Sequence, residues 1–311
     1  MRKMARRDFI RAAACSTLAL STLRASAQAT SPNHFDALSV EPGKMPRLFT
    51  GLCAYSYRQA LLGGQMKLED FIERAVDLKV DGVDMTVYYL HSTDPAYLAH
   101  LRNVAYRAGM PLSGSACRAE LVQANAAGRD AALTDVKKWV DVADRLGASH
   151  LRIFGGIVPK GAAPGPVLDG VVEIFKAAAD YSGQKGIVLG IENHSGVTQS
   201  ADVCLDIMHR VNHPYAGINL DLTHFLPAET SYDQIAACLP YATNVHVRDK
   251  FDDNSPIDMD RVWRMFAATG FKGYMSIELS DTTQSGETGI PRLVTEVKTL
   301  SKKYTSVRRP A

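Results

Sequence analysis

The sequence predicts an α/β protein with a single domain, a (β/α)8 barrel of the TIM type. Three observations support this fold class. Short apolar runs alternate with longer amphipathic segments from residue 47 onward, eight such runs fit into about 250 residues, and glycines stand where helices should end. This number of strand–helix repeats over this length is typical of the barrel. A doubly wound parallel sheet is the alternative architecture.

The apolar runs that we expect to form strands are five to seven residues long and rich in Val, Ile and Leu, as buried parallel strands are. They are residues 48–54, 82–86, 111–116, 150–154, 187–192, 216–221, 242–247 and 274–279.

Amphipathic helices are predicted between the strands. Apolar residues recur three and four positions apart in 68–76 and in 136–146. Gly147, Gly186 and Gly270 follow helical segments, where a left-handed cap conformation favours glycine. The stretch 158–166 follows the fourth strand and is rich in Pro and Gly, so we interpret it as a loop of the active face and not as a domain boundary.

The N-terminus has the pattern of an export signal, with a basic arm as the alternative interpretation. Arg6 and Arg7 precede a mildly apolar stretch, and Ala25-Ser26-Ala27 is typical of a signal-peptidase site. A twin-arginine pair specifies the pathway that exports folded proteins. We therefore expect a periplasmic or secreted protein with four segments: a twin-arginine signal peptide (1–27), a flexible mature N-terminus (28–46), the barrel (47–305) and a C-terminal tail (306–311).

Composition and charge exclude several classes of protein. With 46% hydrophobic and 22% charged residues, the chain is neither disordered nor cysteine-stapled. Beyond the N-terminus no apolar run reaches the ~18 residues that span a bilayer. The net charge of +2 becomes −3 when residues 1–27, with six basic residues and one acid, are removed. This charge disfavours nucleic acid as a partner.

Four cysteines lie beyond the predicted signal peptide, and they lack the CxxC spacing of a zinc or redox site. An oxidising compartment permits disulfides, and Cys204 and Cys238 fall on helices that we expect to be neighbours. We nevertheless expect buried free thiols at Cys53, Cys117, Cys204 and Cys238.

Acidic and imidazole side chains follow four consecutive predicted strands. Glu192, Asp221, His246 and Glu278 each end an apolar run, at intervals of 29, 25 and 32 residues. Because the C-terminal ends of parallel strands meet at one rim, the four side chains should point into one cup. Three carboxylates there would repel one another unless a cation neutralised them. We predict one divalent ion, with Mn²⁺ as the first choice and Mg²⁺, Co²⁺, Fe²⁺ or Zn²⁺ as alternatives.

Two further residues share a strand face with a predicted ligand. His194 and Arg248 lie two residues beyond Glu192 and His246, and strand alternation puts residues two apart on the same face. Both are predicted to bind substrate. Arg248 is expected to bind substrate oxygens or developing negative charge. Its structural alternative is an ion pair with Glu278 or Asp249.

Two other polar residues are also predicted to bind substrate. His224 follows Asp221 by three residues, where the strand turns into its helix, and is expected to contact a substrate hydroxyl or a second metal ion. Arg152 lies on the inward face of the fourth predicted strand. An unpaired guanidinium is costly there, so Arg152 needs an acidic partner or an oxygen-rich ligand.

Together these segments resemble the xylose-isomerase-like TIM barrels of the sugar phosphate isomerase/epimerase superfamily. The resemblance covers roughly residues 48–300 and rests mainly on Leu-Gly-Ile-Glu192-Asn-His, Asn-Leu-Asp221-Leu-Thr-His224, Asn-Val-His246-Val-Arg-Asp and Ser-Ile-Glu278. It implies one divalent ion held by Glu192, Asp221, His246 and Glu278. It also implies that the two glutamates act as acid/base groups across a bound sugar, with His224 and Arg248 contacting it.

The sequence departs from the family pattern at two positions. Asp84 stands where many relatives have Glu, and Arg248 stands where several dehydratase-like relatives have Lys. These departures bear on the reaction rather than on the fold.

We predict a metal-dependent isomerase or epimerase of a non-phosphorylated keto-sugar. A carboxylate would remove the proton beside a metal-bound carbonyl, giving an enediolate, and the second glutamate would return a proton. Export, however, favours a lyase or hydratase acting on keto-glycosides, because sugar phosphates are cytoplasmic whereas glycosides are met outside the cell.

The resemblance leaves other activities open. The main one is a lyase or hydratase acting on a 3-keto-glycoside or inosose that a partner sugar dehydrogenase supplies, and the minor one is a catalytically silent sugar-binding barrel. The resemblance also allows a homodimer. An abasic-site endonuclease is disfavoured, because the chain lacks the D-x-H motif after the seventh strand and is acidic once the signal is removed.

Overall fold

The computed structural model describes residues 45–226, 228–279 and 288–305. The predicted signal peptide (1–27), residues 28–44 and the predicted tail (306–311) lie outside the described residues. Within the described ranges, none of the helices combines the length and the apolar character that crossing a bilayer requires.

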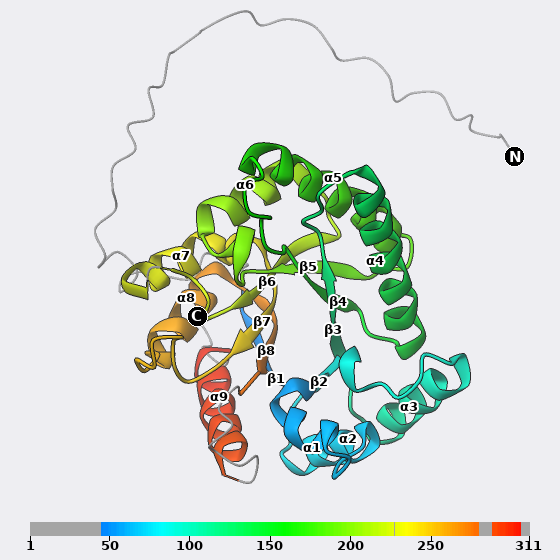
Figure 1. The fold of residues 1–311 in the computed structure, drawn as a ribbon. Coiled ribbons are helices and arrows are strands. Elements are labelled where there is room, and N and C mark those ends of the chain that lie inside the picture. Colours follow the sequence, from blue (N-terminus) through cyan, green and yellow to red (C-terminus); the bar gives the residue numbers. More distant parts are fainter. Residues whose placement is uncertain (1–44, 227, 280–287, 306–311) are drawn as a thin grey trace, which may run out of the picture. The chain divides into compact units, whose positions relative to one another are not determined.

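Parallel strands of the described residues close into a barrel in chain order, with β8 pairing back to β1 (Figure 1). The predicted fold class, a TIM barrel, is therefore confirmed. The strands are β1 (Arg47–Cys53), β2 (Gly82–Thr86), β3 (Leu112–Glu120), β4 (His150–Phe154), β5 (Val188–Glu192), β6 (Ala216–Asp221), β7 (Ala242–Val247) and β8 (Lys272–Ile277).

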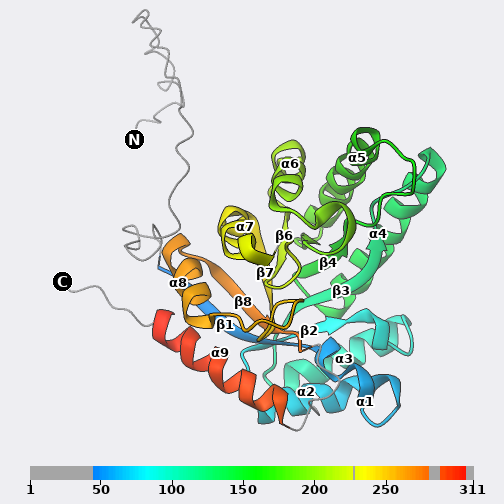
Figure 2. The ribbon, with the colours of Figure 1, turned by 60° about the vertical axis from the view of Figure 1, so that its left-hand side comes forward.

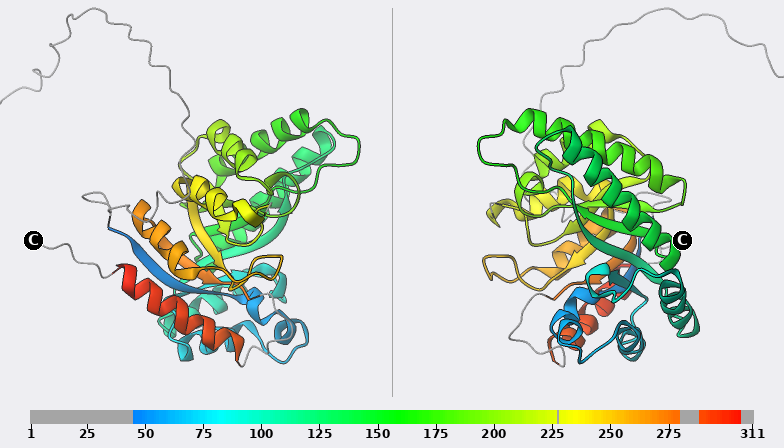
Figure 3. Two further views of the ribbon diagram at one scale, coloured as in Figure 1. Left: turned by 90° about the vertical axis from the view of Figure 1, so that its left-hand side faces the viewer. Right: turned by 45° about the vertical axis from the view of Figure 1, so that its right-hand side comes forward.

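Helices surround the ring of strands (Figure 1). They are α1 (Arg58–Leu62), α2 (Leu68–Asp77), α3 (Pro95–Arg107), α4 (Ala126–Leu146), α5 (Pro164–Gly183), α6 (Ala201–Val211), α7 (Ser231–Cys238), α8 (Met259–Thr269) and α9 (Gly289–Thr305). Figures 2 and 3 show α9 lying along β1, so the last described helix covers the first strand. This contact supports the closure between β1 and β8.

Four of the strands, β2, β4, β6 and β7, have the predicted bounds. The largest difference is in β3, which runs on to Glu120, four residues past the predicted end. Its pairing with β4 is irregular between Ala116 and Glu120, so the chain stays extended there without a regular ladder. At β8 the strand ends at Ile277, which leaves Glu278 as the first residue after it.

The helical patterns are buried much as their periodicity indicates. In α4 the residues Val136, Val140 and Leu146 are fully buried, and in α2 only Val76 of the predicted apolar set is exposed. These faces form the apolar core between the helices and the strands. The cysteines of the described residues, Cys53, Cys117, Cys204 and Cys238, are buried and free.

Two predictions at helix ends need correction. Gly147 and Gly270 cap α4 and α8 in the left-handed conformation, as expected, but Gly186 does not cap α5. That helix ends at Gly183 with a right-handed cap residue, and Gly186 takes its positive φ in the turn that follows. The predicted loop 158–166 also ends early, because α5 begins at Pro164 and proline is well tolerated in a first helical turn.

Candidate active site and metal centre

The four residues predicted to hold a metal ion lie at the C-terminal rim of adjacent strands. Glu192 and Asp221 are the last residues of β5 and β6, and His246 is the penultimate residue of β7. Asp221 and His246 are register partners. Glu278 directly follows β8. All four are buried.

Three of these residues form a tight group. Glu192, Asp221 and His246 each offer a ligand atom, and these atoms lie within 4.8 Å of one another. His246 Nδ1 is 2.7 Å from Glu192 Oε1, the distance of an ion pair when the ring is charged. Carboxylate oxygens and an imidazole nitrogen that converge in this way can surround a cation once the ring has lost its proton at Nδ1.

The Asp221 carboxylate is fixed so that one oxygen stays available. Its Oδ1 accepts hydrogen bonds from Thr223 N (2.8 Å) and Thr223 Oγ1 (2.6 Å). Its Oδ2 is buried and has no hydrogen-bond partner among the described residues, and the same is true of His246 Nδ1. Both atoms have charged neighbours instead: Asp221 Oδ2 lies 3.3 Å from Arg248 Nη2, and His246 Nδ1 lies 2.7 Å from Glu192 Oε1. Carboxylate oxygens with one imidazole nitrogen fit a divalent ion.

Glu278 lies beside this group but outside it. Its Oε1 is 3.6 Å from His246 Nδ1, and its Oε2 is 2.6 Å from Arg248 Nη2. Arg248 Nη2 also lies 3.3 Å from Asp221 Oδ2. The structure thus pairs Arg248 with Glu278, whereas Asp249 pairs with Arg292.

Arg152 reaches the other glutamate. Its Nε lies 3.5 Å from Glu192 Oε2, and its Nη1 donates to the Tyr88 hydroxyl (3.3 Å) and to the Cys117 carbonyl (3.1 Å). Burial alone would raise the pKa of Glu192, but Arg152 and His246 lower it overall. Glu192 is therefore held as a carboxylate, the form that binds a cation.

The two predicted substrate-binding histidines face each other. The rings of His194 and His224 are 4.3 Å apart between centroids, and Phe154 lies 4.9 Å from His194. His224 Nδ1 is 2.9 Å from Asp252 Oδ2, and its Nε2 is 3.5 Å from Asp221 Oδ2.

The surroundings shift the pKa values of the two imidazoles in opposite directions. Burial alone would lower the pKa of His224, but Asp221 and Asp252 raise it overall. Burial lowers the pKa of His194, and the neighbouring His224 adds to this effect. The surroundings therefore favour the charged form of His224, in which both ring nitrogens donate, and the neutral form of His194, which can both donate and accept a hydrogen bond.

Two acids that contact this group had no predicted role in the site. Asp84, in the middle of β2, lies with Oδ2 3.5 Å from His246 Nε2. Its signal in the sequence is a charge inside an apolar strand. Asp252, in the loop after β7, orients His224, but it is one of several acids in that loop, and no pattern separates it from the rest.

Comparisons with known proteins agree with this architecture. A sequence profile described as Xylose isomerase-like TIM barrel matches residues 72–299. No protein with a curated function matches the chain.

Solved structures share the fold at low sequence identity. A D-psicose 3-epimerase with D-tagatose from Clostridium cellulolyticum H10 is 14% identical with a TM-score of 0.68, over 83% of this chain and 99% of that one. The probable 3-DHS dehydratase AsbF from Bacillus anthracis is 14% identical with a TM-score of 0.65, over 81% and 98%. The IOLI protein with a bound zinc atom is 15% identical with a TM-score of 0.65, over 85% and 100%.

Proposed function

We propose that this chain, which belongs to the xylose isomerase-like TIM barrel family, is a metal-dependent isomerase or epimerase of a non-phosphorylated keto-sugar. The observation that carries the proposal is the convergence of Glu192, Asp221 and His246 within 4.8 Å, with Glu278 beside them. The fold shared with ketose 3-epimerases supports the choice of a sugar as substrate.

Glu192, Asp221 and His246 would hold the ion, with Glu278 as the fourth predicted ligand and Mn²⁺ as the first choice. When bound, a divalent ion supplies Lewis-acid chemistry: it polarises a carbonyl oxygen and stabilises negative charge that develops next to it.

The chain's own residues supply the proton transfers. Glu192 and Glu278 approach His246 Nδ1 to 2.7 and 3.6 Å, so both carboxylates border the same small space. One, as the carboxylate, would take the proton from the carbon beside the carbonyl, and the other, carrying a proton taken up from solvent, would deliver it to the opposite face. Arg152 and Arg248 each hold one of these glutamates, which keeps both carboxylates oriented.

His224 would donate a hydrogen bond to a substrate hydroxyl. Its ring is fixed at Nδ1 by Asp252, which leaves Nε2 turned toward the centre, 3.5 Å from Asp221. His194 packs against the same ring and would contact the sugar at the rim.

Elimination is the second candidate, because the fold is shared with a probable dehydratase. A single carboxylate base suffices when a leaving group lies β to the carbon that loses its proton. The substrate would then be a 3-keto-glycoside or an inosose supplied by a sugar dehydrogenase.

One experiment separates these activities. The purified chain, loaded with Mn²⁺, is incubated in D₂O with free ketoses and separately with 3-keto-glycosides, and NMR follows both reactions after the metal is chelated. Deuterium entering an intact ketose at an epimerised or isomerised carbon supports the first proposal. Release of an aglycone together with an unsaturated or hydrated keto-sugar would show that the activity is that of a lyase and not of an isomerase or epimerase. Binding without turnover of any sugar leaves only the silent binding barrel.

We also propose that residues 1–27 direct twin-arginine export. The support is in the sequence: the pair Arg6-Arg7, the apolar stretch and Ala25-Ser26-Ala27. Mass spectrometry of the protein recovered from the periplasm should find Gln28 at the mature N-terminus. A variant with Arg6→Lys and Arg7→Lys should stay in the cytoplasm with the segment attached, and its normal export would refute the proposal.

A further inference from the structure

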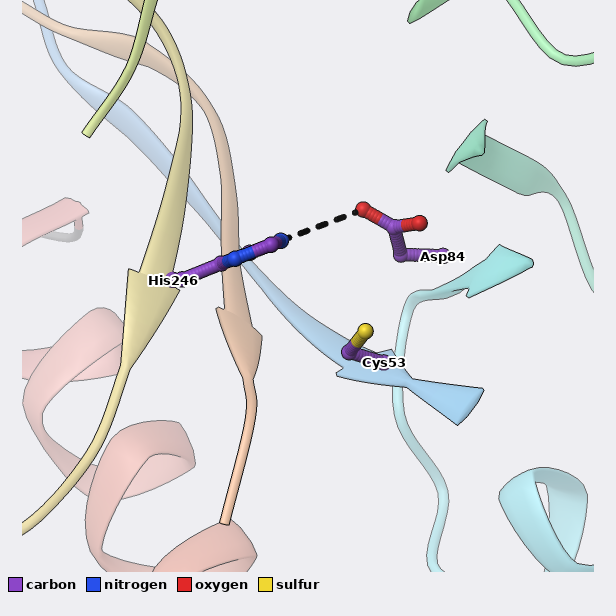
Figure 4. Close-up of side chains that lie close together, drawn as sticks. All are labelled: Cys53, Asp84 and His246. Atoms are coloured by element: carbon purple, nitrogen blue, oxygen red, sulfur yellow. Dashed lines mark hydrogen bonds and ion pairs between the residues drawn. The ribbon is translucent and has the colours of Figure 1, made fainter. Parts of the chain in front are cut away.

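A second group of potential ligands shares His246 with the candidate metal centre. Cys53 on β1, Asp84 on β2 and His246 on β7 bring one ligand atom each within 4.8 Å. Figure 4 shows the imidazole of His246 extending toward the Asp84 carboxylate, with the Cys53 sulfur close by. The two groups use different edges of the ring, because Nε2 faces Asp84 and Nδ1 faces Glu192 and Glu278.

We propose that Asp84 is a positioning residue that fixes the tautomer of His246 and thereby presents its Nδ1 lone pair to the ion held with Glu192 and Asp221. The inference rests on the proposed function, since it requires that ion. It gives a role to Asp84, which the sequence marks only as a departure from the family pattern and which lies outside the predicted ligand set.

The tautomer follows from what each atom can donate or accept. A carboxylate only accepts hydrogen bonds, and a neutral imidazole has one N–H and one bare nitrogen. When an ion lies between His246 Nδ1 and Glu192, the ring gives its Nδ1 lone pair to the ion and keeps its proton on Nε2, which lies 3.5 Å from Asp84 Oδ2. Metal-binding histidines are commonly held in this way by an acceptor at their second nitrogen.

Asp84 is itself tied to the opposite side of the centre. Asn244 Nδ2 lies 3.4 Å from Asp84 Oδ2 and donates to Asn219 Oδ1 at 2.8 Å. Asn219 Nδ2 donates in turn to Glu192 Oε1 at 2.9 Å. A chain of buried amides thus runs from Asp84 to Glu192, and His246 bridges the same two carboxylates. The position of the ring is set from both edges at once.

The position of Asp84 is costly for stability alone. The residue is fully buried, and its Oδ1 has no hydrogen-bond partner in the part of the chain that the structure describes. Apolar residues of similar volume often replace buried charges without loss of stability. A carboxylate at this site is better explained by what it does to His246.

The cluster with Cys53 is a poorer fit to a second metal site. An ion there would need the lone pair of Nε2, and the ring would then carry its proton on Nδ1 and be lost to the first site. Burial and the charges of Asp84 and Glu278 raise the pKa of the Cys53 thiol well above its ordinary value. The sulfur also has contacts of its own, since it lies 3.5 Å from Thr86 Oγ1 and 3.9 Å from Glu278 Oε1.

The test compares Asp84→Asn with the matched variant Cys53→Ala, which alters the other member of the cluster. Isothermal titration of the metal-free full chain with Mn²⁺ gives affinity and stoichiometry, and circular dichroism checks folding. We expect one ion per chain in all three proteins, about 10- to 100-fold weaker binding in Asp84→Asn and less than about 2-fold change in Cys53→Ala.

Three titration results would overturn the proposal. Unchanged affinity in Asp84→Asn would remove the role of Asp84 while leaving the proposed function intact. Two ions per parental chain and one in Cys53→Ala would make the cysteine cluster a site of its own. No Mn²⁺ binding by the parental chain would remove both the proposed function and this inference.

A measurement on the parental chain does not depend on how the variant folds. In ¹⁵N-histidine-labelled protein loaded with diamagnetic Zn²⁺, we expect His246 to be protonated at Nε2 and ligated through Nδ1. The signal is assigned by its loss in His246→Gln. A proton on Nδ1 would contradict the proposal whatever the titrations give.

Discussion

Arg248 Nη2 lies 2.6 Å from Glu278 Oε2 and 3.3 Å from Asp221 Oδ2, so one guanidinium joins the proposed acid/base residue to a proposed metal ligand. The guanidinium is largely buried, and such a pair is strong because few waters compete for it. Arg248 thus orients the Glu278 carboxylate in the absence of substrate.

Replacing Arg248 by Met should therefore reduce catalysis. The Glu278 carboxylate would lose its partner and its orientation, and we expect kcat/KM to fall about 10²-fold or more. Steady-state kinetics measure this, with Arg292→Met as the control, since Arg292 forms a half-exposed pair with Asp249. Equal kinetics in the two variants would show that the pair with Glu278 does not serve the reaction.

Glu278→Gln should abolish turnover while the fold persists. The amide keeps the shape of the side chain but cannot accept a proton, and general acid–base groups contribute about 10²- to 10⁴-fold. Turnover and thermal unfolding are measured in parallel, with the largely exposed Glu173 changed to Gln as the control. Turnover at the parental rate would remove Glu278 from the acid/base assignment.

Chelation should inactivate and destabilise the protein together. A ligand that binds only the folded chain adds about 2.7 kcal/mol at a free concentration of 100 times its Kd. We expect EDTA to lower the unfolding temperature and abolish turnover, and added Mn²⁺ to restore both. Scanning fluorimetry follows the first effect. If the unfolding temperature does not change as Mn²⁺ is added, the result argues against the metal centre.

His150 should make the barrel sensitive to acid. Burial lowers its pKa to about 4, and its Nε2 is bonded only to the Thr243 hydroxyl (3.1 Å) among the described residues. Between about pH 6.5 and 4 the unfolded chain binds a proton at this residue and the folded chain does not. As the pH is lowered through this range, the free energy of unfolding should therefore decrease by about 1.4 kcal/mol per pH unit, or about 3 kcal/mol in total.

The variant His150→Gln isolates this effect. Urea unfolding at pH 7 and pH 4.5 should show a smaller loss of stability in His150→Gln than in the parental chain. The exposed His100, changed to Gln, should leave the difference unaltered. The same pH dependence in all three proteins would mean that other groups cause the acid sensitivity.

Gly196→Ala should destabilise the loop that carries His194. Gly196 has φ +81°, and a Cβ there would lie 2.2 Å from the Gly156 carbonyl oxygen. The left-handed conformation alone costs a non-glycine residue about 1–2 kcal/mol, and the clash adds to it.

The control for this variant is Gly165→Ala, in the first turn of α5, where a Cβ meets no described atom within 4 Å. It should be neutral or stabilising by up to about 1 kcal/mol. Urea unfolding measures both variants. Equal free energies of unfolding in the two variants would show that the backbone at Gly156 and Gly196 moves apart at little cost.

The strands and the rim residues could be predicted from the sequence because both are local properties. A buried parallel strand is a short apolar run, and the residue that ends it lies at the rim of the barrel whatever its neighbours are. Glu192, Asp221 and His246 were predictable for this reason. Gly186 was not, since a glycine with positive φ serves a turn as well as a helix cap.

Which charges meet was decided only by the tertiary structure. Asp84 and His246 are 162 residues apart, on β2 and β7, and they meet because the sheet closes on itself. The sequence left two acids, Glu278 and Asp249, as possible partners of Arg248. In the structure Arg248 pairs with Glu278, and Asp249 pairs with Arg292. Periodicity specifies the face on which a side chain lies, but partners across a barrel depend on closure and register, which no single segment contains.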